Sequence, residues 1–450
     1  MTHTRGQKIA VIGSGIAGLA AAWRLSLVHD VTLFEAAPRL GGHANTVSAQ
    51  IGGEHVDVDT GFIVFNPRNY PNFTPVLDYF DVETAPSSMS FAASLDGGRF
   101  EYSSNPDGLF AQKRNLVRPR MWRMIRDILR LHDHARRGDH AGEVRSLDDF
   151  LRAEGYSSTF REDHILPMCA AIWSSPVDQM RAYPARAFFE FFTNHGLLQL
   201  SDRPQWRTVT GGSHRYVERL AGAIKGRVRL SAPVRGIDRS GGQVTVRTDT
   251  DESRFDQIVL ACHSDQALAL IDAPDPMERE LLGAIRYRPN TAILHTDTGL
   301  LPRRRSAWAS WNYLESARTA DSGGRISLTY WMNALQPLPT QTPVLVTLNP
   351  DVAPDPARVL HTDQYDHPVF DAAAIAAQAR FGTLQGHRRT WYCGAWLGAG
   401  FHEDGLQSGL AVAEALGAPG RPWACTGGDT RIPWTQAPAP VQPALAVAAE

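Results

Sequence analysis

The sequence predicts an α/β protein in which a doubly wound, parallel-sheet domain is interrupted by an inserted α+β domain. Three observations lead to this fold class. A strand, a glycine-rich turn, a helix and a second strand open the chain over residues 8–35. Further strand patterns return in the middle of the chain, and a glycine-rich turn followed by a helix pattern stands near its end, over residues 392–416. Elements of one sheet that are spread over the whole chain indicate that the chain leaves this domain and returns to it.

The opening unit carries the pattern of a dinucleotide site. Apolar residues predict a strand over Lys8–Ile12, a helix over Ile16–Leu27 and a second parallel strand over Val31–Glu35. The turn between the first strand and the helix has the GxGxxG spacing, which allows a tight turn, close approach of a pyrophosphate and close helix–strand packing. An acidic residue that accepts ribose hydroxyls is expected at the end of the second strand, where Glu35 stands 22 residues after the first glycine. The predicted Rossmann-like site comprises Gly13, Ser14, Gly15, Ile16, Ala17, Gly18, Glu35 and Ala36.

The later strand patterns predict the domain organisation. They stand at residues 228–230, 234–237, 244–247, 257–260, 291–295, 326–331 and 344–348, and a last helix pattern covers residues 406–416. We predict a discontinuous nucleotide-binding domain, an inserted substrate domain and a loosely held tail rich in proline and alanine. The limits are residues 1–85, 206–270 and 386–417 for the first domain, 86–205 and 271–385 for the second, and 418–450 for the tail.

Composition narrows the class of protein. The formal net charge of -2 over 450 residues gives no reason to expect a nucleic-acid partner. The four cysteines are scattered and form no CxxC pair, so we expect neither a disulfide framework nor a metal site. Glycines interrupt the first apolar run, and no segment reaches the roughly 18 to 20 apolar residues that span a bilayer. We therefore expect a cytoplasmic protein whose only membrane contact is peripheral, at the inner face of the membrane.

The residues after the second strand point to FAD rather than NAD. Arg39-Leu40-Gly41-Gly42-His43-Ala44-Asn45-Thr46 resembles the RxGGxxxT signature of flavin-containing amine oxidoreductases, and Val58-Asp59-Thr60-Gly61 resembles the next element of that superfamily. The superfamily includes amine oxidases, protoporphyrinogen oxidase and carotenoid desaturases. Adjacent glycines let backbone amides lie against the cofactor. The resemblance implies an FAD site that includes Arg39, Gly41, Gly42, His43, Thr60 and Gly61.

The other end of the chain resembles the closing flavin motif of the same superfamily. Tyr392-Cys393-Gly394-Ala395-Trp396 is followed by Gly405-Leu406-Gln407-Ser408-Gly409 and an alanine-rich helix, whose N-terminus is expected to face the flavin. The resemblance is specific over residues 8–66 and 391–417, and it implies a Rossmann-like FAD-binding domain with an inserted α+β substrate domain, as in amine oxidases and protoporphyrinogen oxidase. The residues that it adds to the cofactor site are Val234, Gly394, Ala395, Gly405, Leu406, Gln407 and Ser408.

Two departures from the superfamily pattern bear on the cofactor. Relatives usually carry Gly-Asp where this chain has Gly394-Ala395, so the carboxylate contact is either missing or supplied by Glu403 or Asp404. Relatives commonly carry arginine at the position of His43. No cysteine stands where a covalent flavin link is expected, so FAD is predicted to be bound non-covalently.

A narrower resemblance suggests a substrate class. The chain is similar to bacterial NAD/FAD-binding-type proteins that are linked with cyclopropane-fatty-acid-synthase-like methyltransferases, and to a module fused in front of plant cyclopropane synthases. The stretches concerned are residues 42–46, Ala171-Ile172-Trp173-Ser174-Ser175, Asn194-His195-Gly196-Leu197-Leu198 and residues 400–406. This resemblance implies an unsaturated or methyl-branched acyl chain of a phospholipid as substrate, its desaturation as in furan fatty acid formation, and a methyltransferase as a partner.

The interior of the chain offers two features with two interpretations each. Leu116 to Leu131 mixes arginines with apolar residues, and it fits either a helix that lies on an anionic membrane or an amphipathic helix packed on its own domain. The phenylalanines of residues 188–192 fit either a substrate tunnel or an ordinary core. His195 and Glu190 are our candidates for a catalytic base, although His195 also fits a structural role.

Three functions remain open from the sequence. The first is a flavin-dependent desaturase or oxidase of a lipid acyl chain. The second is an amine or porphyrinogen oxidase, but the only lysines are Lys8, Lys113 and Lys225, and none suits the lysine that amine oxidases of this fold hold near the flavin. The third is a non-catalytic, FAD-stabilised partner of a lipid methyltransferase.

Overall fold

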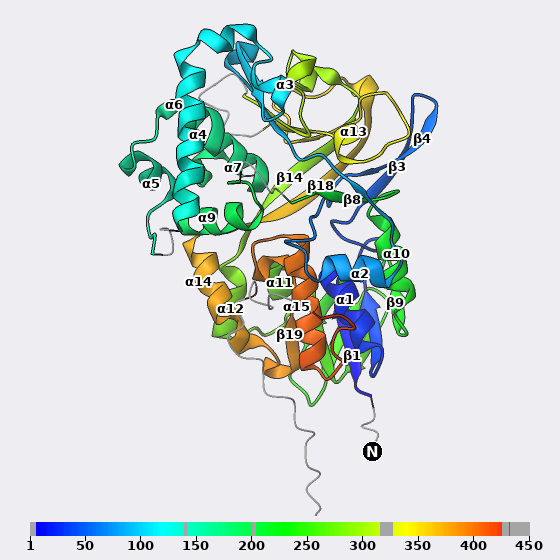
Figure 1. Cartoon of the computed structure of the whole chain (residues 1–450). Coiled ribbons are helices and arrows are strands. Elements are labelled where there is room, and N and C mark those ends of the chain that lie inside the picture. Colours follow the sequence, from blue (N-terminus) through cyan, green and yellow to red (C-terminus); the bar gives the residue numbers. More distant parts are fainter. Residues whose placement is uncertain are drawn as a thin grey trace, which may run out of the picture.

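The computed structural model describes residues 6–138, 142–173, 175–199, 204–315, 327–424 and 432. Two lobes are evident in Figure 1, with the first strand β1 and the last helix α15 in one lobe and helices α4 to α9 in the other. No helix among the described residues is long and apolar enough to cross a membrane.

The lobe that holds the N-terminus is built on a five-stranded sheet whose neighbouring strands all run parallel. Its central strands are almost wholly apolar because helices cover both faces. Ile9, Val11 and Val259, for example, have no exposed surface. The strands, in spatial order, are β19 (Thr390–Tyr392), β13 (Gln257–Leu260), β1 (Lys8–Ile12), β2 (Asp30–Phe34) and β9 (Arg227–Arg229).

Segments from distant parts of the chain cover this sheet. One face packs in a single core with α1 (Ile16–Leu25), α2 (Phe73–Tyr79), α10 (His214–Gly222) and α15 (His402–Ala415). The other face shares a core with α11 (Ser264–Leu270), α12 (Pro276–Gly283), α14 (Ala372–Arg380) and an antiparallel meander. The meander strands are β10 (Val234–Asp238), β11 (Val244–Thr248) and β12 (Glu252–Phe255).

The second lobe contains a seven-stranded sheet that is antiparallel except where β15 pairs with β6. Its order is β18 (Val359–Val369), β14 (Arg286–His295), β17 (Leu345–Leu348), β16 (Ser327–Trp331), β15 (Trp311–Leu314), β6 (Phe91–Leu95) and β7 (Phe100–Ser103). Two small antiparallel pairs lie outside it, β3 (Thr46–Ile51) with β4 (Glu54–Asp59) and β5 (Thr84–Pro86) with β8 (Arg207–Val209).

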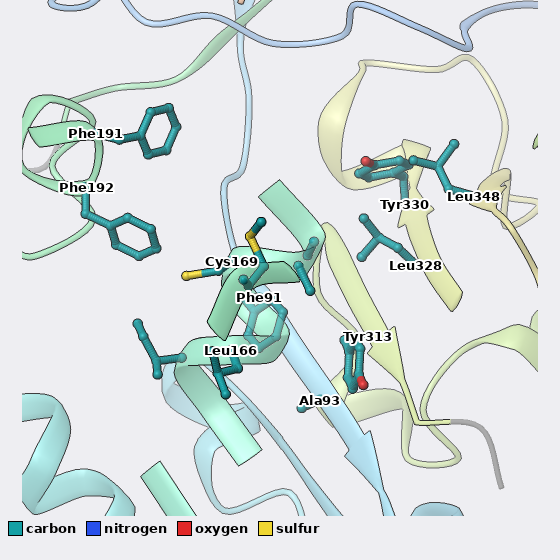
Figure 2. Packing of buried hydrophobic residues seen from close by; sticks show 14 of the residues in the cluster. Phe91, Ala93, Leu166, Cys169, Phe191, Phe192, Tyr313, Leu328, Tyr330 and Leu348 are labelled. Carbon is teal, nitrogen blue, oxygen red and sulfur yellow. The ribbon is translucent and has the colours of Figure 1, made fainter. Parts of the chain in front are cut away.

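Helices of the second lobe share one apolar core with this sheet. They are α3 (Pro106–Leu109), α4 (Pro119–Arg137), α5 (Leu147–Ala153), α6 (Ser158–Phe160), α7 (Leu166–Trp173), α8 (Val177–Arg181), α9 (Ala185–Asn194) and α13 (Met332–Leu335). A π-helical turn at Arg161–Ile165 joins α6 to α7. Figure 2 shows Leu166 and Cys169 of α7 near Phe91 of β6, with Tyr313, Leu328 and Tyr330 on the neighbouring strands. This apolar layer becomes one wall of the site described below.

The structure confirms the fold class and the predicted strands, and two packing features bear on the predicted domain limits. Residues 276–285 and 372–384, which we assigned to the substrate domain, contribute Leu281, Ala374 and Phe381 to the same core as Ile258 of the parallel sheet. Apolar faces of α12 and α14 therefore belong with the nucleotide-binding domain. Within the predicted tail, Trp423 stacks on Trp23 with ring centroids 6.2 Å apart. Residues 425–431 and 433–450 of that tail lie outside the described residues.

Candidate active site

The first glycine-rich turn has the geometry of a phosphate-binding turn. Gly13 has a φ of +100°, a conformation that side chains rarely adopt, and its N–H donates to the Phe34 carbonyl at 2.9 Å. A Cβ on Gly18 would lie 1.9 Å from the Gly13 carbonyl oxygen, so only glycine fits there. A Cβ on Gly15 would meet nothing within 4 Å, because this residue borders an open cavity. The turn thus presents its backbone and the N-terminus of α1 to that cavity.

Glu35 stands at the end of β2 and is held against the same turn. The Ser14 backbone N–H and hydroxyl both donate to Glu35 Oε2, at 2.9 and 2.5 Å, and the Ala37 N–H donates to Oε1 at 2.8 Å. These bonds fix the carboxylate at the cavity wall, where it can accept hydrogen bonds from a ribose.

The second glycine pair is locked to the first turn and to the end of β4. The Gly41 N–H donates to the Ser14 carbonyl at 3.0 Å, and a Cβ on Gly42 would lie 3.1 Å from Gly15 Cα. A Cβ on Gly61 would lie 2.1 Å from the His43 carbonyl oxygen. Backbone segments therefore approach each other here more closely than side chains would allow.

The C-terminal motif completes the cavity from the far end of the chain. The Gly394 N–H donates to Ser408 Oγ at 2.9 Å, and this hydroxyl donates to the Gly405 carbonyl at 2.7 Å, which fixes the entry into α15. A Cβ on Gly409 would lie 2.1 Å from the Ala17 carbonyl oxygen, so glycine lets α15 pack closely on α1. As a result, the N-terminal residues Ile16 and Gly405 of the two helices border the same cavity.

One cavity of about 1350 Å³ joins these elements to the second lobe. Most of the predicted cofactor residues line it: Gly13, Ser14, Gly15, Ile16, Ala17, Glu35, Ala36, Gly41, Gly42, His43, Thr60, Gly61, Val234, Gly394, Ala395 and Gly405. The others do not line it: Gly18, Arg39, Leu406, Gln407 and Ser408. Gly18 and Ser408 act through the turns that they shape, and Arg39 donates to the Gly42 carbonyl at 3.0 Å.

Neither acidic residue proposed as a substitute for the missing aspartate reaches the cavity. Glu403 is fully buried and accepts hydrogen bonds from Asn72 and from the Phe73 N–H. Its carboxylate thereby caps the N-terminus of α2. Asp404 accepts from the Phe401 N–H at 2.8 Å as a helix cap. The carboxylate contact expected from relatives is therefore not supplied by these two residues.

Among the described residues, seven histidines line the cavity: His43, His132, His164, His195, His263, His367 and His402. Four of them, His43, His263, His367 and His402, come from four different segments of the chain. The ring of His43 lies 5.6 Å from that of His367 and 6.1 Å from that of His263. Burial lowers the pKa of His402 to about 3 and that of His367 to about 4, and burial together with the neighbouring imidazoles lowers the pKa of His43 well below its usual value. The four rings are thus neutral near pH 7. Among the described residues, no group of His, Cys, Asp and Glu side chains is placed to hold a metal ion.

The part of the cavity in the second lobe is apolar and rich in aromatic rings. Its lining includes Phe91, Ile125, Met168, Ile172, Trp173, Phe191, Trp206, Tyr330, Leu348, Phe370 and Phe401. Phe188, Phe189 and Phe192 do not line it and belong to the core, so the phenylalanine run divides between the two interpretations.

The two candidate bases lie in different surroundings. His195 lines the cavity, and its Nδ1 lies 2.9 Å from the Phe191 carbonyl oxygen. A carbonyl can only accept a hydrogen bond, so Nδ1 carries the proton and Nε2 is the basic nitrogen of the neutral ring. Glu190 is outside the cavity, where it is exposed and pairs with Arg186 at 2.7 Å. The structure therefore removes Glu190 as a candidate base, since its helix turns it to solvent.

Sequence reasoning missed five histidines of the cavity, His132, His164, His263, His367 and His402. His263 follows β13 at the carboxyl edge of the parallel sheet, where ligands of such sheets bind, so its position carried a usable signal. His367 comes from β18, far along the chain, and nothing in its neighbourhood marks it as a site residue. His402, the first residue of α15, stacks on Phe62, and its Nε2 shares a hydrogen bond of 2.6 Å with the Tyr216 hydroxyl.

Comparison with known proteins agrees with this geometry. The sequence profile of the flavin containing amine oxidoreductase family matches residues 16–416. The chain belongs to this family. Its cofactor is FAD. The glycine turns, whose missing Cβ atoms leave room along the cavity, and the paired helix N-termini fit the diphosphate and flavin ends of this cofactor.

Individual relatives are distant. The carotenoid phi-ring synthase of Streptomyces griseus is 28% identical over 66% of this chain and 59% of its own length. This chain spans about 60% of the length of the curated relatives that it matches. Among solved structures, the CLA-producing fatty acid isomerase from P. acnes gives a TM-score of 0.65 at 17% identity, covering 91% of this chain and 98% of the isomerase. Putrescine oxidase bound to putrescine gives a TM-score of 0.62 at 15% identity, covering 91% of this chain and 98% of the oxidase. These likenesses show the fold.

Proposed function

We propose that this flavoprotein desaturates an unsaturated or methyl-branched fatty acyl chain of a phospholipid. The observation that carries the proposal is the continuous cavity, which runs from the dinucleotide turns into an apolar chamber of the second lobe. Its volume of about 1350 Å³ exceeds the roughly 300–1,000 Å³ of a typical single-ligand site. It therefore suits two occupants, the cofactor and an apolar substrate placed end to end.

The chamber has the chemistry of an acyl-chain site. Its walls are aliphatic and aromatic, and the charged residues that line the cavity are Glu35, Arg235 and Asp366. The first two belong to the nucleotide-binding domain, and Asp366 is exposed on β18. Within the described residues, no carboxylate reaches the apolar chamber to pair with an ammonium group. None of the three lysines lines the cavity.

Desaturation removes a hydride from one carbon and a proton from its neighbour. The bound flavin supplies a two-electron acceptor for the hydride. We assign the proton to His195 Nε2, because the Phe191 carbonyl fixes the tautomer that leaves this nitrogen basic. As the hydride leaves one carbon, the C–H of the adjacent carbon becomes acidic, so a weak base such as a neutral imidazole can accept this proton. Phe191, with its ring centroid 3.9 Å from that of His195, and Phe401 hold the imidazole in the apolar wall.

The names of two related proteins agree with an apolar substrate. The fatty acid isomerase shares the fold, and the carotenoid phi-ring synthase shares weak sequence similarity. An amine substrate is the second candidate, because putrescine oxidase has the same fold and aromatic walls can bind a cation. The absence of a lysine at the cavity favours the lipid.

The proposal is tested by product analysis. Holoenzyme is incubated in air with phospholipids that carry saturated, monounsaturated or methyl-branched acyl chains, and the acyl chains are analysed by mass spectrometry. We expect loss of two hydrogen atoms from the monounsaturated or branched chain only. Peroxide release with polyamines and unchanged lipids would instead support an amine oxidase. Unchanged lipids and amines, together with stable binding to a lipid methyltransferase, would support a non-catalytic partner.

A further inference from the structure

The surface formed by Lys113–Val117 and helix α4 combines exposed apolar side chains with a concentration of positive charge; we call it the α4 face. Figure 1 shows α4 along the outer side of the second lobe. Four of the twelve large apolar side chains that are exposed in the described structure lie on it. They are Leu116, Val117, Trp122 and Leu129, which are 49%, 83%, 51% and 47% exposed. Such a concentration on one face indicates a surface that is covered in function.

The apolar residues follow one another along one side of this face. Trp122 Nε1 donates to the Leu116 carbonyl at 2.8 Å, which holds the indole over the preceding turn. Leu129 follows Trp122 by seven residues, two helical turns later, and therefore lies on the same side of α4, about 10 Å away. An indole at such a position is typical of side chains that lie at the boundary between lipid and water.

The same face is strongly basic although the whole chain is slightly acidic. Residues 113–130 contain seven basic residues and one acidic residue, in a chain of net charge -2. Some of these arginines are engaged, since Arg120 pairs with Asp96 and Asp163, and Arg126 and Arg130 flank the buried Asp127. Arg123 is exposed and forms no ion pair with the described residues. The excess charge attracts an anionic surface.

The side of α4 next to the exposed apolar residues is a wall of the substrate chamber. Ile125, Ile128, Leu129 and His132 line the cavity, and Leu129 is also exposed. The chamber therefore reaches the molecular surface beside Leu129, inside the strip of exposed apolar residues. A lipid bound against this strip would have its acyl chain next to the opening.

We propose that the α4 face docks the enzyme on the surface of a membrane that contains anionic lipids, and that the acyl chain enters the cavity beside Leu129. The entry of substrate rests on the proposed function, whereas docking itself does not. The arginines attract the anionic headgroups, and Val117 and Trp122 enter the boundary region between headgroups and chains. The binding of the membrane thus orients the mouth of the chamber toward its substrate.

The test is flotation of the full-chain holoenzyme with vesicles whose acyl chains are saturated. We expect binding to phosphatidylcholine vesicles that contain phosphatidylglycerol and little binding to phosphatidylcholine alone. Arg123→Gln should weaken binding about fivefold, because one cation near such a surface contributes about that much. The Val117→Gln/Trp122→Gln double variant should weaken it about tenfold or more. Matched controls are Arg254→Gln and Val352→Gln, at exposed positions of other segments, and they should bind as the parent protein does.

Two results would overturn the proposal. One is an absence of binding to anionic vesicles, and the other is equal binding by the α4-face variants and the controls. Loss of a dimer in Val117→Gln, seen by sedimentation in the absence of lipid, would assign the face to a second copy of the chain instead. Val117→Gln is also tested as a single variant, because its side chain is 83% exposed and its replacement should leave the fold intact.

A second assay separates docking from the proposed function. The α4-face variants should lose turnover of phospholipid in vesicles but keep turnover of the same lipid dispersed in detergent. If all proteins, including the parent, fail on both lipid forms while vesicle flotation still depends on Arg123, the proposed function fails and docking stands. If flotation fails while turnover of dispersed lipid persists, docking fails and the function stands.

Discussion

Two glycines three residues apart allow cofactor binding to be separated from folding. Gly15 and Gly18 belong to the same turn, but only Gly15 borders the cavity. A Cβ on Gly15 would meet nothing within 4 Å, and the residue has a φ of −62° and a ψ of 176°, which alanine adopts without strain. A Cβ on Gly18 would lie 1.9 Å from the Gly13 carbonyl oxygen and 3.0 Å from Ala261 Cβ.

The two substitutions should therefore affect different properties, the affinity for FAD in one case and the free energy of unfolding in the other. Gly15→Ala should leave the free energy of unfolding of the apoprotein unchanged or raise it by up to about 1 kcal/mol, because alanine restricts the unfolded chain. The same methyl group occupies space that the diphosphate needs, and overpacking of about 1–3 kcal/mol corresponds to roughly 5- to 150-fold weaker FAD binding. Gly18→Ala must displace backbone on both sides, so it should lower the free energy of unfolding by about 3 kcal/mol or more.

The assay has two parts. Apoprotein is titrated with FAD while quenching of flavin fluorescence is followed, and urea unfolding of each apoprotein gives its stability. We expect Gly15→Ala to be stable but poor in FAD binding, and Gly18→Ala to be defective in both. FAD binding by Gly15→Ala with the parent affinity would refute the reasoning, since the phosphates would then lie elsewhere in the cavity.

Three further predictions follow from individual side chains. His195→Gln should lower kcat about 10²- to 10⁴-fold and leave the flavin spectrum of the holoenzyme unchanged; parent-like turnover would exclude His195 as the base. Glu403→Gln places an amide against the N–H donors of Asn72 and Phe73, so urea unfolding should show that the free energy of unfolding falls by about 2–4 kcal/mol. The control Glu190→Gln, at an exposed position, should change the free energy of unfolding by less than about 0.5 kcal/mol. Burial lowers the pKa of His164 and His402 to about 3, below the value of about 6.5 in an unfolded chain. Between these values the unfolded chain binds more protons, so the unfolding free energy should be level above about pH 7 and fall as the pH drops below about 6.5, by up to about 1.4 kcal/mol per pH unit for each histidine. Urea midpoints at several pH values measure this slope, and it should be shallower in His402→Gln; an unchanged slope would contradict the assignment.

The parts of the site that local sequence determines could be predicted. The turn at Gly13–Gly18 and the packing of α15 on α1 require glycines, because a Cβ on Gly18 or Gly409 would lie only 1.9 or 2.1 Å from a backbone carbonyl oxygen. Such constraints act between neighbouring elements of one βα unit or between two helices in close contact. They leave a signature in residue spacing, and most of the residues predicted on that basis line the cavity.

The parts that tertiary packing determines could not be predicted. His367 reaches the cavity only because β18 pairs with β14 across the second lobe, and no local pattern records that pairing. Glu190 was a reasonable base until the orientation of α9 placed it in solvent beside Arg186. The packing of α12 and α14 is hard to predict for a similar reason, since their apolar faces do not reveal which sheet they cover.

The central claim is that the flavin of this protein accepts a hydride from a lipid acyl chain. The most direct measurement is the absorbance of the bound flavin under anaerobic conditions during addition of candidate substrates. Phospholipids with monounsaturated or methyl-branched chains are compared with saturated phospholipids, polyamines and aromatic amines. Bleaching of the flavin by the unsaturated or branched lipid alone is the predicted result. Bleaching by an amine, with no response to any lipid, would contradict the account.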